Sequence, residues 1–368
     1  MDPATLESLI IQELWRSSEI SRRDLADQLA VARSTAGRRV DSLIKRGILR
    51  EKGLEERDRA GRPRRFLELC AEHGRFVGFD FDARAIYASL IDFAEQPVAE
   101  KKISLSSRPT REEVIDYLRE QIKDFRSQDP SIPIFGFGIG TPGRVIKSAR
   151  VAVGYDYIRG WEDVDLLKEL SLDPSVLHIE NNTRATALGE YWLSKPDSPS
   201  HLICLSIRTG ISAAIISNGQ LLRGQNELSG EIRNWRVGGG PKSPTLEGSA
   251  TVLQFGNHGK PSVRRWNRFV KDCRAGESEA LAQLESLVDM HADTLARLIQ
   301  IADPEKVVIA GAFNAIGEPY LQRVREATEL SRGNHFTACP PIEFVSAGEF
   351  TGARGAAALA AQHYKPSP

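Results

Sequence analysis

Two asparagines follow an acid at a turn where proton-transfer chemistry is often placed. The segment IENNTRATALGE (179–190) begins like a strand, turns at Asn181 and Asn182, and continues as an alanine-rich helical run. Turns between a strand and a helix often present a catalytic acid or base to a substrate. A carboxylate accepts a proton there, whereas a neutral amide only donates and accepts hydrogen bonds. The turn therefore belongs either to a site of chemistry or to a site that binds without reacting.

The N-terminal part of the chain carries a local excess of positive charge. Over residues 33–65, 12 Lys and Arg stand against 5 Asp and Glu, although the 368-residue chain has a formal net charge of +0. A basic block attached to a nearly neutral body indicates a separate module that binds a polyanion.

The periodicity of the first 70 residues predicts a winged helix-turn-helix. Residues 3–18 have the apolar stripe of a helix, and Ser21 is a good N-cap for a second helix, with Asp24 at the N3 position of a capping box. The segment RSTAGRRVDSLIKRG (33–47) predicts a third helix that ends at Gly47. Two strands separated by a polar, charged loop follow it and complete the winged module.

The third helix and the wing supply candidate contacts to double-stranded DNA. The N-terminal residues of such a helix meet base edges in the major groove, and an Arg at a wing reaches a minor groove or phosphates. The candidate DNA-binding residues are Arg33, Ser34, Thr35, Arg38, Arg39, Arg62, Arg64 and Arg65. The alternative is a solvated basic hairpin on a protein-interaction module.

The remaining three hundred residues alternate strands and helices twice over, which predicts an α/β architecture of two lobes. Two strands with a tight turn are expected in 74–93, a hairpin with its turn at SNGQ in 201–224, and a small-residue helix in 350–364. The stretch GIGTPG (138–143) matches a dinucleotide-binding fingerprint. No helix opens after Pro142, so a dinucleotide site is excluded.

Cysteine usage and hydropathy indicate a cytoplasmic protein. The four cysteines, Cys70, Cys204, Cys273 and Cys339, are far apart and form no CxxC pair. That pattern is typical of a reducing compartment and gives no structural zinc signature. No signal peptide and no apolar run of membrane-spanning length is expected.

The order of these motifs resembles the ROK family (repressors, open reading frames, kinases) in its regulator form. The resemblance covers nearly all of residues 5–362 and is most specific in GIGTPGRV, ENNTRATALGE, LLRGQNELSGEI and GARGAAALA. It implies an α/β chain with an N-terminal winged helix-turn-helix followed by a two-lobed actin/hexokinase-like ATPase-fold domain. The expected domains are 1–70 for the winged helix-turn-helix, 71–183 with helix 350–364 for lobe 1, and 184–349 for lobe 2.

The resemblance also shows that the elements which hold ATP in family kinases are altered. A Gly-Gly-Thr-Lys phosphate turn is replaced by Asp82 to Ala85, and Arg208 stands in place of a glycine in the second phosphate loop. The glycines after a late strand are reduced to AGA (310–312). Glycine-rich turns bind phosphate because their N–H groups approach it without interference from a Cβ. ATP is therefore not expected as a cofactor.

Family kinases have an Asp at the turn described first, and it serves as general base toward the sugar hydroxyl. Asn182 holds that position here, so we expect kinase activity to be lost and no residue to be catalytic. The shape of the turn still suits hydrogen bonding of Asn181 and Asn182 to a ligand. The alternative is that Asn182 only caps the following helix.

The family zinc motif is also missing, since Asn234 stands for its His and every Cys of its cluster is absent. No metal is therefore expected. Glu231 and Glu247 remain at positions that hold sugar hydroxyls in the family, as polyol recognition requires. The resemblance thus implies the ligand-binding set Asn181, Asn182, Glu231, Asn234 and Glu247. Solvated surface acids are the alternative for Glu231 and Glu247.

These observations predict a DNA-binding transcriptional regulator, a repressor, whose non-catalytic domain senses a sugar or a sugar derivative. We expect a homodimer or a dimer of dimers on an inverted-repeat operator, because two winged helices need two half-sites. Two alternatives stay open. One is a regulator controlled by a protein partner, and the other is a residual sugar kinase.

Overall fold

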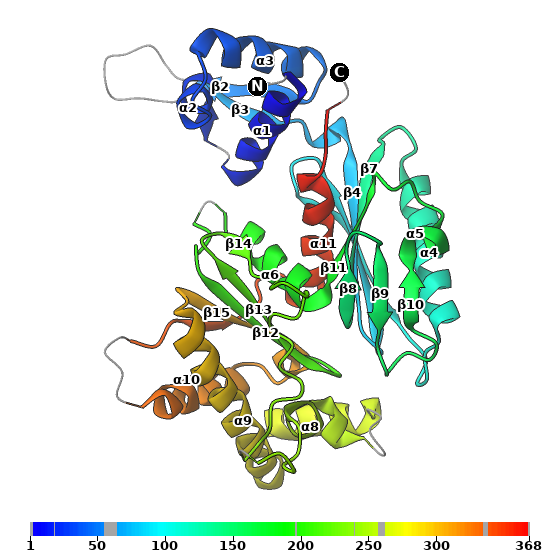
Figure 1. Cartoon of the computed structure of the whole chain (residues 1–368), viewed down its shortest axis with the longest axis vertical. Coiled ribbons are helices and arrows are strands. Elements are labelled where there is room, and N and C mark those ends of the chain that lie inside the picture. Colours follow the sequence, from blue (N-terminus) through cyan, green and yellow to red (C-terminus); the bar gives the residue numbers. More distant parts are fainter. Residues whose placement is uncertain are drawn as a thin grey trace.

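The N-terminal domain lies at one end of the molecule, above two lobes that are each built on a large β-sheet (Figure 1). In this computed structural model the described residues are 3–17, 19–54, 65–195, 197–238, 240–256, 262–333 and 338–366. The N-terminal domain contains α1 (Pro3–Arg16), β1 (Ile20–Ser21), α2 (Arg22–Gln28), α3 (Arg33–Lys45), β2 (Leu49–Leu54) and β3 (Arg65–Leu69). Its sheet is antiparallel with the order β1-β3-β2.

Local sequence determines these short helices. Ser21 caps α2, and the Asp24 carboxylate accepts the Ser21 N–H at 3.0 Å, so the predicted capping box is confirmed. In α3 the side chains of Ala36, Val40 and Leu43 are buried, and the cations of the helix therefore lie on its other faces.

Lobe 1 contains a mixed sheet with helices on both faces. Its strands are β4 (Arg75–Phe81), β5 (Ala85–Asp92), β6 (Pro97–Ser104), β7 (Ile134–Thr141) and β11 (Leu177–Asn181), in the order β11-β7-β4-β5-β6. One face is covered by α4 (Arg111–Gln128) and α5 (Leu166–Leu170), and the other by α11 (Thr351–Gln362) (Figure 1). A small sheet of β8 (Arg144–Ile146), β9 (Val151–Gly154) and β10 (Glu162–Asp165) lies beside them.

Lobe 2 contains a second sheet with the order β14-β13-β12-β15-β16. Its strands are β12 (Leu202–Ile207), β13 (Ile211–Ser217), β14 (Gln220–Leu221), β15 (Lys306–Gly311) and β16 (Ile342–Phe344). Its helices are α7 (Leu246–Ala250), α8 (Val263–Ala275), α9 (Ser278–Ala302) and α10 (Glu318–Arg332). No helix among the described residues is long and apolar enough to cross a membrane.

The prediction of a two-stranded hairpin in 201–224 is wrong, because this segment forms three strands, β12, β13 and β14. The turn at SNGQ is present, with positive φ at Asn218 and Gly219, but it joins β13 to β14. The β12–β13 turn lies earlier, where Arg208 N–H donates to the Gly210 carbonyl at 2.8 Å. The stronger turn signal of Asn-Gly concealed the earlier one.

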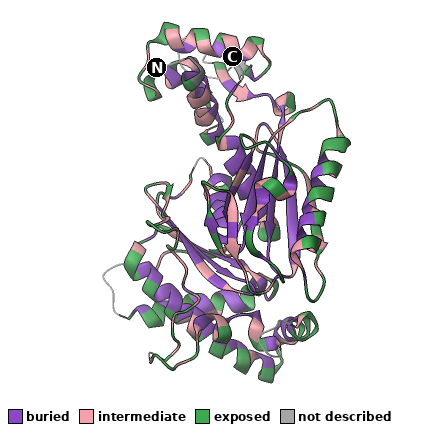
Figure 2. Cartoon of the chain, turned by 45° about the vertical axis from the view of Figure 1, so that its right-hand side comes forward, coloured by how far each residue is buried: buried purple, intermediate pink, exposed green. Residues whose placement is uncertain are grey.

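Two helices form a shared layer between the sheets of the lobes. α11 packs on β4 and β7, while α6 (Asn182–Leu193) packs on β12 and β13. Glycine allows α6 and α11 to approach closely, because a Cβ at Gly355 would lie 1.9 Å from the Ala185 carbonyl oxygen. The sheets and both helices are mostly buried (Figure 2), so the order sheet, α11, α6, sheet is the core of the two-lobed domain.

The close approach of α6 and α11 predicts the effect of one methyl group. Gly355→Ala places a Cβ against backbone that cannot move alone, and we expect it to lower the free energy of unfolding by about 1–3 kcal/mol. Urea denaturation measures this change. Gly37→Ala in α3 is the matched control, because a Cβ at Gly37 would have no other atom within 4 Å. Equal stability of the two variants would contradict the packing described here.

Candidate functional site

Four of the five predicted ligand residues line one small polar cavity at the boundary of the lobes. Its volume is about 50 Å³, and its lining includes Asn181, Asn182, Glu231 and Glu247. Asn234 is different, because its side chain is exposed and is not part of this lining. Within the described residues, no cluster of three or more His, Cys, Asp or Glu is placed to hold a metal ion.

The two asparagines divide their tasks at the start of α6. Asn181 is the N-cap, and its side-chain oxygen accepts the N–H groups of Thr183 at 3.0 Å and Arg184 at 3.2 Å. Its amide nitrogen donates to the Gly143 carbonyl at 2.9 Å. The capping role considered for Asn182 thus belongs to Asn181, whose side-chain oxygen and one amide N–H are used within the protein.

Asn182 keeps one hydrogen-bonding group available. Its amide nitrogen donates to the Phe81 carbonyl at 3.1 Å, which fixes the orientation of the side chain. No donor from the described residues reaches its side-chain oxygen. Because Asn182 lines the cavity, this oxygen is an acceptor for a hydroxyl group of a ligand.

Glu231 and Glu247 bring two partly buried carboxyl groups to the same cavity. Burial raises the pKa of both groups above the usual range, and Arg233 acts in the opposite direction on each. Neither carboxylate is consumed by a salt bridge among the described residues. Both are partly buried in the cavity lining, where their oxygens can accept hydrogen bonds from a ligand.

The structure adds residues to the cavity that sequence patterns did not identify. Tyr155, Thr183, Ser212 and Arg233 also line it, and Thr183 and Ser212 share a hydrogen bond of 2.5 Å. Thr183 belongs to the motif ENNTRATALGE, so its place in the cavity could have been predicted from the sequence. Tyr155 and Arg233 come from loops without a spacing signal.

The former phosphate turn between β4 and β5 is closed by its own carboxylate. Asp82 is buried, and one of its oxygens accepts the N–H groups of Arg84 at 2.8 Å and Ala85 at 3.2 Å. Burial opposes ionisation of Asp82, but Arg84 and Arg208 outweigh it and lower its pKa. The N–H groups that a glycine-rich turn would offer to phosphate are therefore occupied.

Arg208 makes a buried, two-pronged ion pair with Asp80. Its Nη1 and Nη2 donate to the two carboxylate oxygens at 3.0 and 2.6 Å. Burial raises the pKa of Asp80 to about 6, and the charge and hydrogen bonds of Arg208 act in the opposite direction. Since Asp80 lies on β4 and Arg208 at the end of β12, the pair ties lobe 1 to lobe 2.

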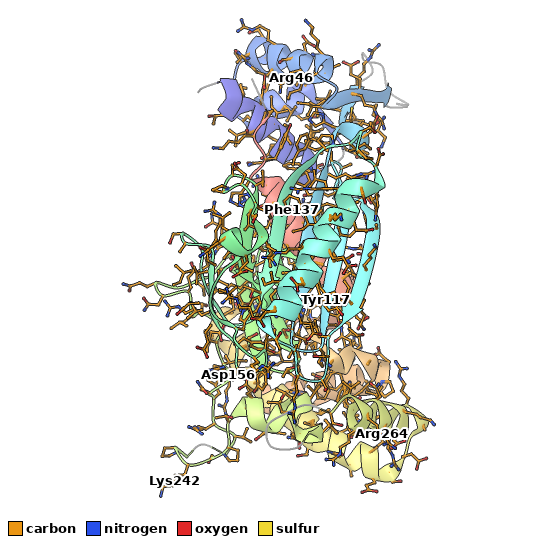
Figure 3. All side chains as sticks on the ribbon, turned by 90° about the vertical axis from the view of Figure 1, so that its right-hand side faces the viewer. Arg46, Tyr117, Phe137, Asp156, Lys242 and Arg264 are labelled. Carbon is orange, nitrogen blue, oxygen red and sulfur yellow. The ribbon has the colours of Figure 1, made fainter. Side chains whose placement is uncertain are left out.

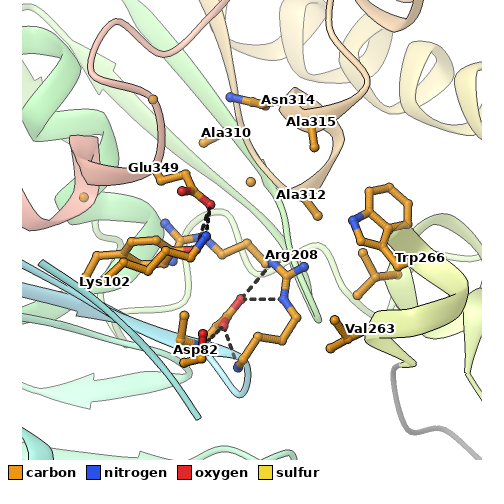
Figure 4. A pocket seen from close by; sticks show the side chains of 18 of the residues that line it. Asp82, Lys102, Arg208, Val263, Trp266, Ala310, Ala312, Asn314, Ala315 and Glu349 are labelled. Atoms are coloured by element: carbon orange, nitrogen blue, oxygen red, sulfur yellow. Dashed lines mark hydrogen bonds and ion pairs between the residues drawn. The ribbon is translucent and has the colours of Figure 1, made fainter. Parts of the chain in front are cut away.

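Arg208 and Asp82 also stand at the boundary between the small cavity and a larger one. The larger cavity has a volume of about 630 Å³ and includes Trp266 and Ala312 on its lobe 2 side. Arg208 extends into it beside Asp82, and Lys102 pairs there with Glu349 at 2.5 Å (Figure 4). Arg208 and Asp82 thus place a cation and an anion where the two cavities meet.

The predicted DNA-binding residues differ in how free their side chains are. Arg33 and Arg38 are exposed on α3 and have no partner among the described residues. Arg39 lies 3.7 Å from the buried Glu7 of α1, so it also holds the helices together. Arg65 pairs with Glu51 at 2.7 Å, and Ser34 and Thr35 lie in the first turn of α3. Arg62 and Arg64 lie outside the described residues.

Fold and sequence together define a winged helix-turn-helix joined to a two-lobed domain of the actin/hexokinase type. A profile described as winged helix-turn-helix DNA-binding matches residues 5–50, and the ROK family profile matches residues 76–363. The chain belongs to the ROK family. The matched segments agree with the order of modules predicted from the motifs.

Known regulators and known sugar kinases are both similar to this chain. A xylose repressor of Caldicellulosiruptor bescii is 24% identical over 352 residues, covering 86% of each chain. The crystal structure of a ROK family transcriptional regulator, a homolog of the E. coli Mlc protein, superposes with a TM-score of 0.72 at 17% identity and covers 97% of each chain. A ROK glucokinase from Streptomyces griseus, in complex with glucose and AMPPNP, gives a TM-score of 0.68 at 20% identity, covering 78% of this chain and all of the kinase, 100%.

The buried ion pair predicts a large effect on stability. Arg208→Met leaves the Asp80 carboxylate buried without a cation, and we expect the free energy of unfolding to fall by about 3–5 kcal/mol. Urea denaturation at pH 7 measures this loss. The double variant Asp80→Asn/Arg208→Met removes both charges and should recover most of it.

The matched control is Arg297→Met, which breaks an exposed pair with Asp293 on α9. Its expected cost is about 1 kcal/mol or less. A cost for Arg208→Met no larger than that of the control would show that the buried pair does not hold the lobes together.

Proposed function

We propose that the protein is a DNA-binding transcriptional repressor whose two-lobed domain binds a sugar or sugar derivative without phosphorylating it. One observation carries this proposal. A cavity with hydroxyl-binding groups, Asn182, Glu231 and Glu247, is kept next to a phosphate position that Arg208 and Asp82 fill. The similarity to xylose repressors supports it.

Loss of phosphoryl transfer follows from two features of the site. Asn182 offers a neutral amide where a base is needed, so the attacking hydroxyl keeps its proton. Asp82 and Asp80 add negative charge, and Arg208 is already neutralised by Asp80. ATP would meet N–H groups that Asp82 already occupies, and the nearby cations Arg84 and Arg208 are already paired with Asp82 and Asp80. We therefore propose that the domain uses no ATP and no zinc.

The DNA-binding function is assigned to α3 and to the wing. We propose that Arg33, Ser34, Thr35 and Arg38 meet the DNA, with Arg39, Arg62, Arg64 and Arg65 supporting backbone contacts. Two such modules in a homodimer would bind the two halves of an inverted repeat in the cytoplasm. We keep the division 1–70, 71–183 with 350–364, and 184–349 as the proposed domains.

Sugar binding is tested by thermal shift and titration with D-xylose, D-glucose and ATP, because a ligand of the native state raises the melting temperature. We expect at least one sugar to bind and ATP not to bind. Asn182→Ala and Glu247→Gln should each weaken that sugar by about tenfold or more, through loss of a hydrogen bond from a desolvated site. Asn234→Ala is the control, because its side chain is exposed outside the cavity.

A sugar that binds equally well to the Asn182, Glu247 and Asn234 variants would place its site elsewhere. If neither sugar nor ATP binds at millimolar concentration, control by a partner protein becomes the better explanation.

DNA binding is tested by the salt dependence of affinity for a duplex. Arg38→Ala should weaken binding and lower the slope of log Kd against log salt by about 1, because one phosphate contact is lost. Arg264→Ala is the control. Arg264 is exposed on α8, at the opposite end of the molecule from the N-terminal domain, where Arg46 lies (Figure 3). Equal loss in both variants would mean that α3 does not contact the DNA.

A further inference from the structure

Helix α6 runs from the sugar cavity to the junction with the N-terminal domain. It starts at Asn182 in the cavity lining and ends at Leu193, with Lys195 two residues beyond. Its 12 residues span about 18 Å at the rise of an α-helix. One rigid element therefore reaches from a proposed ligand contact to the other side of the two-lobed domain.

Polar contacts along its length fix α6 to lobe 2. Near its start, the Arg184 guanidinium pairs with Glu227 at 2.6 Å. Near its end, the fully buried Glu190 accepts hydrogen bonds from Lys306 at 3.1 Å and from the Ser346 N–H at 2.8 Å. These contacts tie the position of α6 to that of lobe 2, alongside its packing on α11.

Beyond its last turn, α6 contacts the part of lobe 1 that holds the N-terminal domain. Lys195 pairs with Glu95, in the turn between β5 and β6, at 2.9 Å. Two residues earlier in that turn, the Phe93 carbonyl accepts the indole N–H of Trp15 from α1 at 2.8 Å. Trp15 also packs on Phe93 and Phe76, with ring centroids 5.5 and 6.1 Å away. The turn therefore contacts Lys195, just after α6, through Glu95, and it contacts α1 through Phe93.

The turn is held by hydrogen bonds, and Glu95 adopts an energetically unfavourable conformation in it. Asp92 accepts the N–H groups of Ala94 and Gln96, each at 2.9 Å. Glu95 has φ +61°, a left-handed conformation that L-residues avoid. One Glu95 carboxylate oxygen is buried without a hydrogen-bond partner, which adds a desolvation penalty. Glycine or asparagine would form the turn alone more easily.

Space on both sides of this ion pair allows it to shift. Cavities of about 650 and 520 Å³ lie at the junction, and both are lined by Trp15, Glu95, Trp192 and Lys195. The side chains of the pair are mostly buried, but each lines both cavities, so there is room beside the pair for a rearrangement. A pair that joins two rigid elements next to such space can exist in two arrangements.

We propose that Lys195 and Glu95 are positioning residues which transmit occupancy of the sugar cavity to the DNA-binding domain. This inference rests on the proposed sugar-sensing function and names its route. Ligand draws the lobes together, α6 displaces Lys195, and Lys195 displaces the 92–96 turn and with it Trp15. Binding at either end must then bias the other end by the same factor.

The first experiment needs no ligand and measures hydrogen exchange of α1 and of residues 92–96 in the full chain. Asn182→Ala removes the hydrogen bond from α6 to Phe81 and perturbs the cavity end. Lys195→Met removes the ion pair at the junction end. We expect each to change exchange in α1 by about fivefold or more, and the double variant to match Lys195→Met alone.

Lys101→Met is the matched control, because it breaks a pair with Asp124 on the far face of lobe 1 at 2.5 Å; α1 should exchange as in the wild type. Additive effects of Asn182→Ala and Lys195→Met on α1, or no effect of Asn182→Ala alone, would overturn the proposed route.

The second experiment adds D-xylose and D-glucose as probes. In the wild type, the sugar that binds should slow exchange in 181–195 and change it in α1. Lys195→Met should keep the first effect and lose the second, and the charge reversal Glu95→Lys/Lys195→Glu should restore it. Retention of the α1 response in Lys195→Met would overturn the route. If neither sugar changes 181–195 in the wild type, the sugar-sensing proposal fails, while the first experiment still decides the route.

Discussion

The ion pair between Arg208 and Asp80 is the interaction on which the rest of the two-lobed domain depends. Arg208 is largely buried, and the chain supplies a fully buried carboxylate, Asp80, from the other lobe as its partner, with hydrogen bonds of 3.0 and 2.6 Å. The same guanidinium occupies the boundary between the two cavities. A single contact therefore links the two lobes at the place where the two cavities meet. Asp82 lies beside this pair, and its carboxylate accepts the N–H groups of Arg84 and Ala85 in its own turn.

The second constraint is the layer of two helices between the sheets. Gly189 and Gly355 let the backbones of α6 and α11 approach so closely that no side chain fits between them at these positions. Packed cores of this kind switch between discrete arrangements rather than deform continuously. α6 carries cavity residues at one end and the Lys195–Glu95 pair at the other. A helix that is needed to close the core thus also connects a binding site with a DNA-binding domain.

Much of this could be predicted from the sequence, because the relevant signals are local. The capping box at Ser21 and the two strands with a tight turn around Asp82 follow from local residue patterns. The set Asn181, Asn182, Glu231 and Glu247 came from matched motifs, and the structure gathers it in one cavity. Asn234 lies outside this lining, since a matched position in a loop does not determine where the side chain points. The Arg208–Asp80 and Lys195–Glu95 pairs were not predictable, since their partners lie 128 and 100 residues apart and no periodicity relates them.

We propose that the site binds a sugar and has lost phosphoryl transfer. The most direct measurement is calorimetric titration of the purified protein with D-xylose and D-glucose, followed by assay of ADP release from ATP with the bound sugar at high protein concentration. We expect a saturable heat on titration with a sugar, and no release of ADP that depends on the sugar. ADP release that depends on the sugar and disappears in Asn182→Ala would contradict it, because Asn182 would then support catalysis.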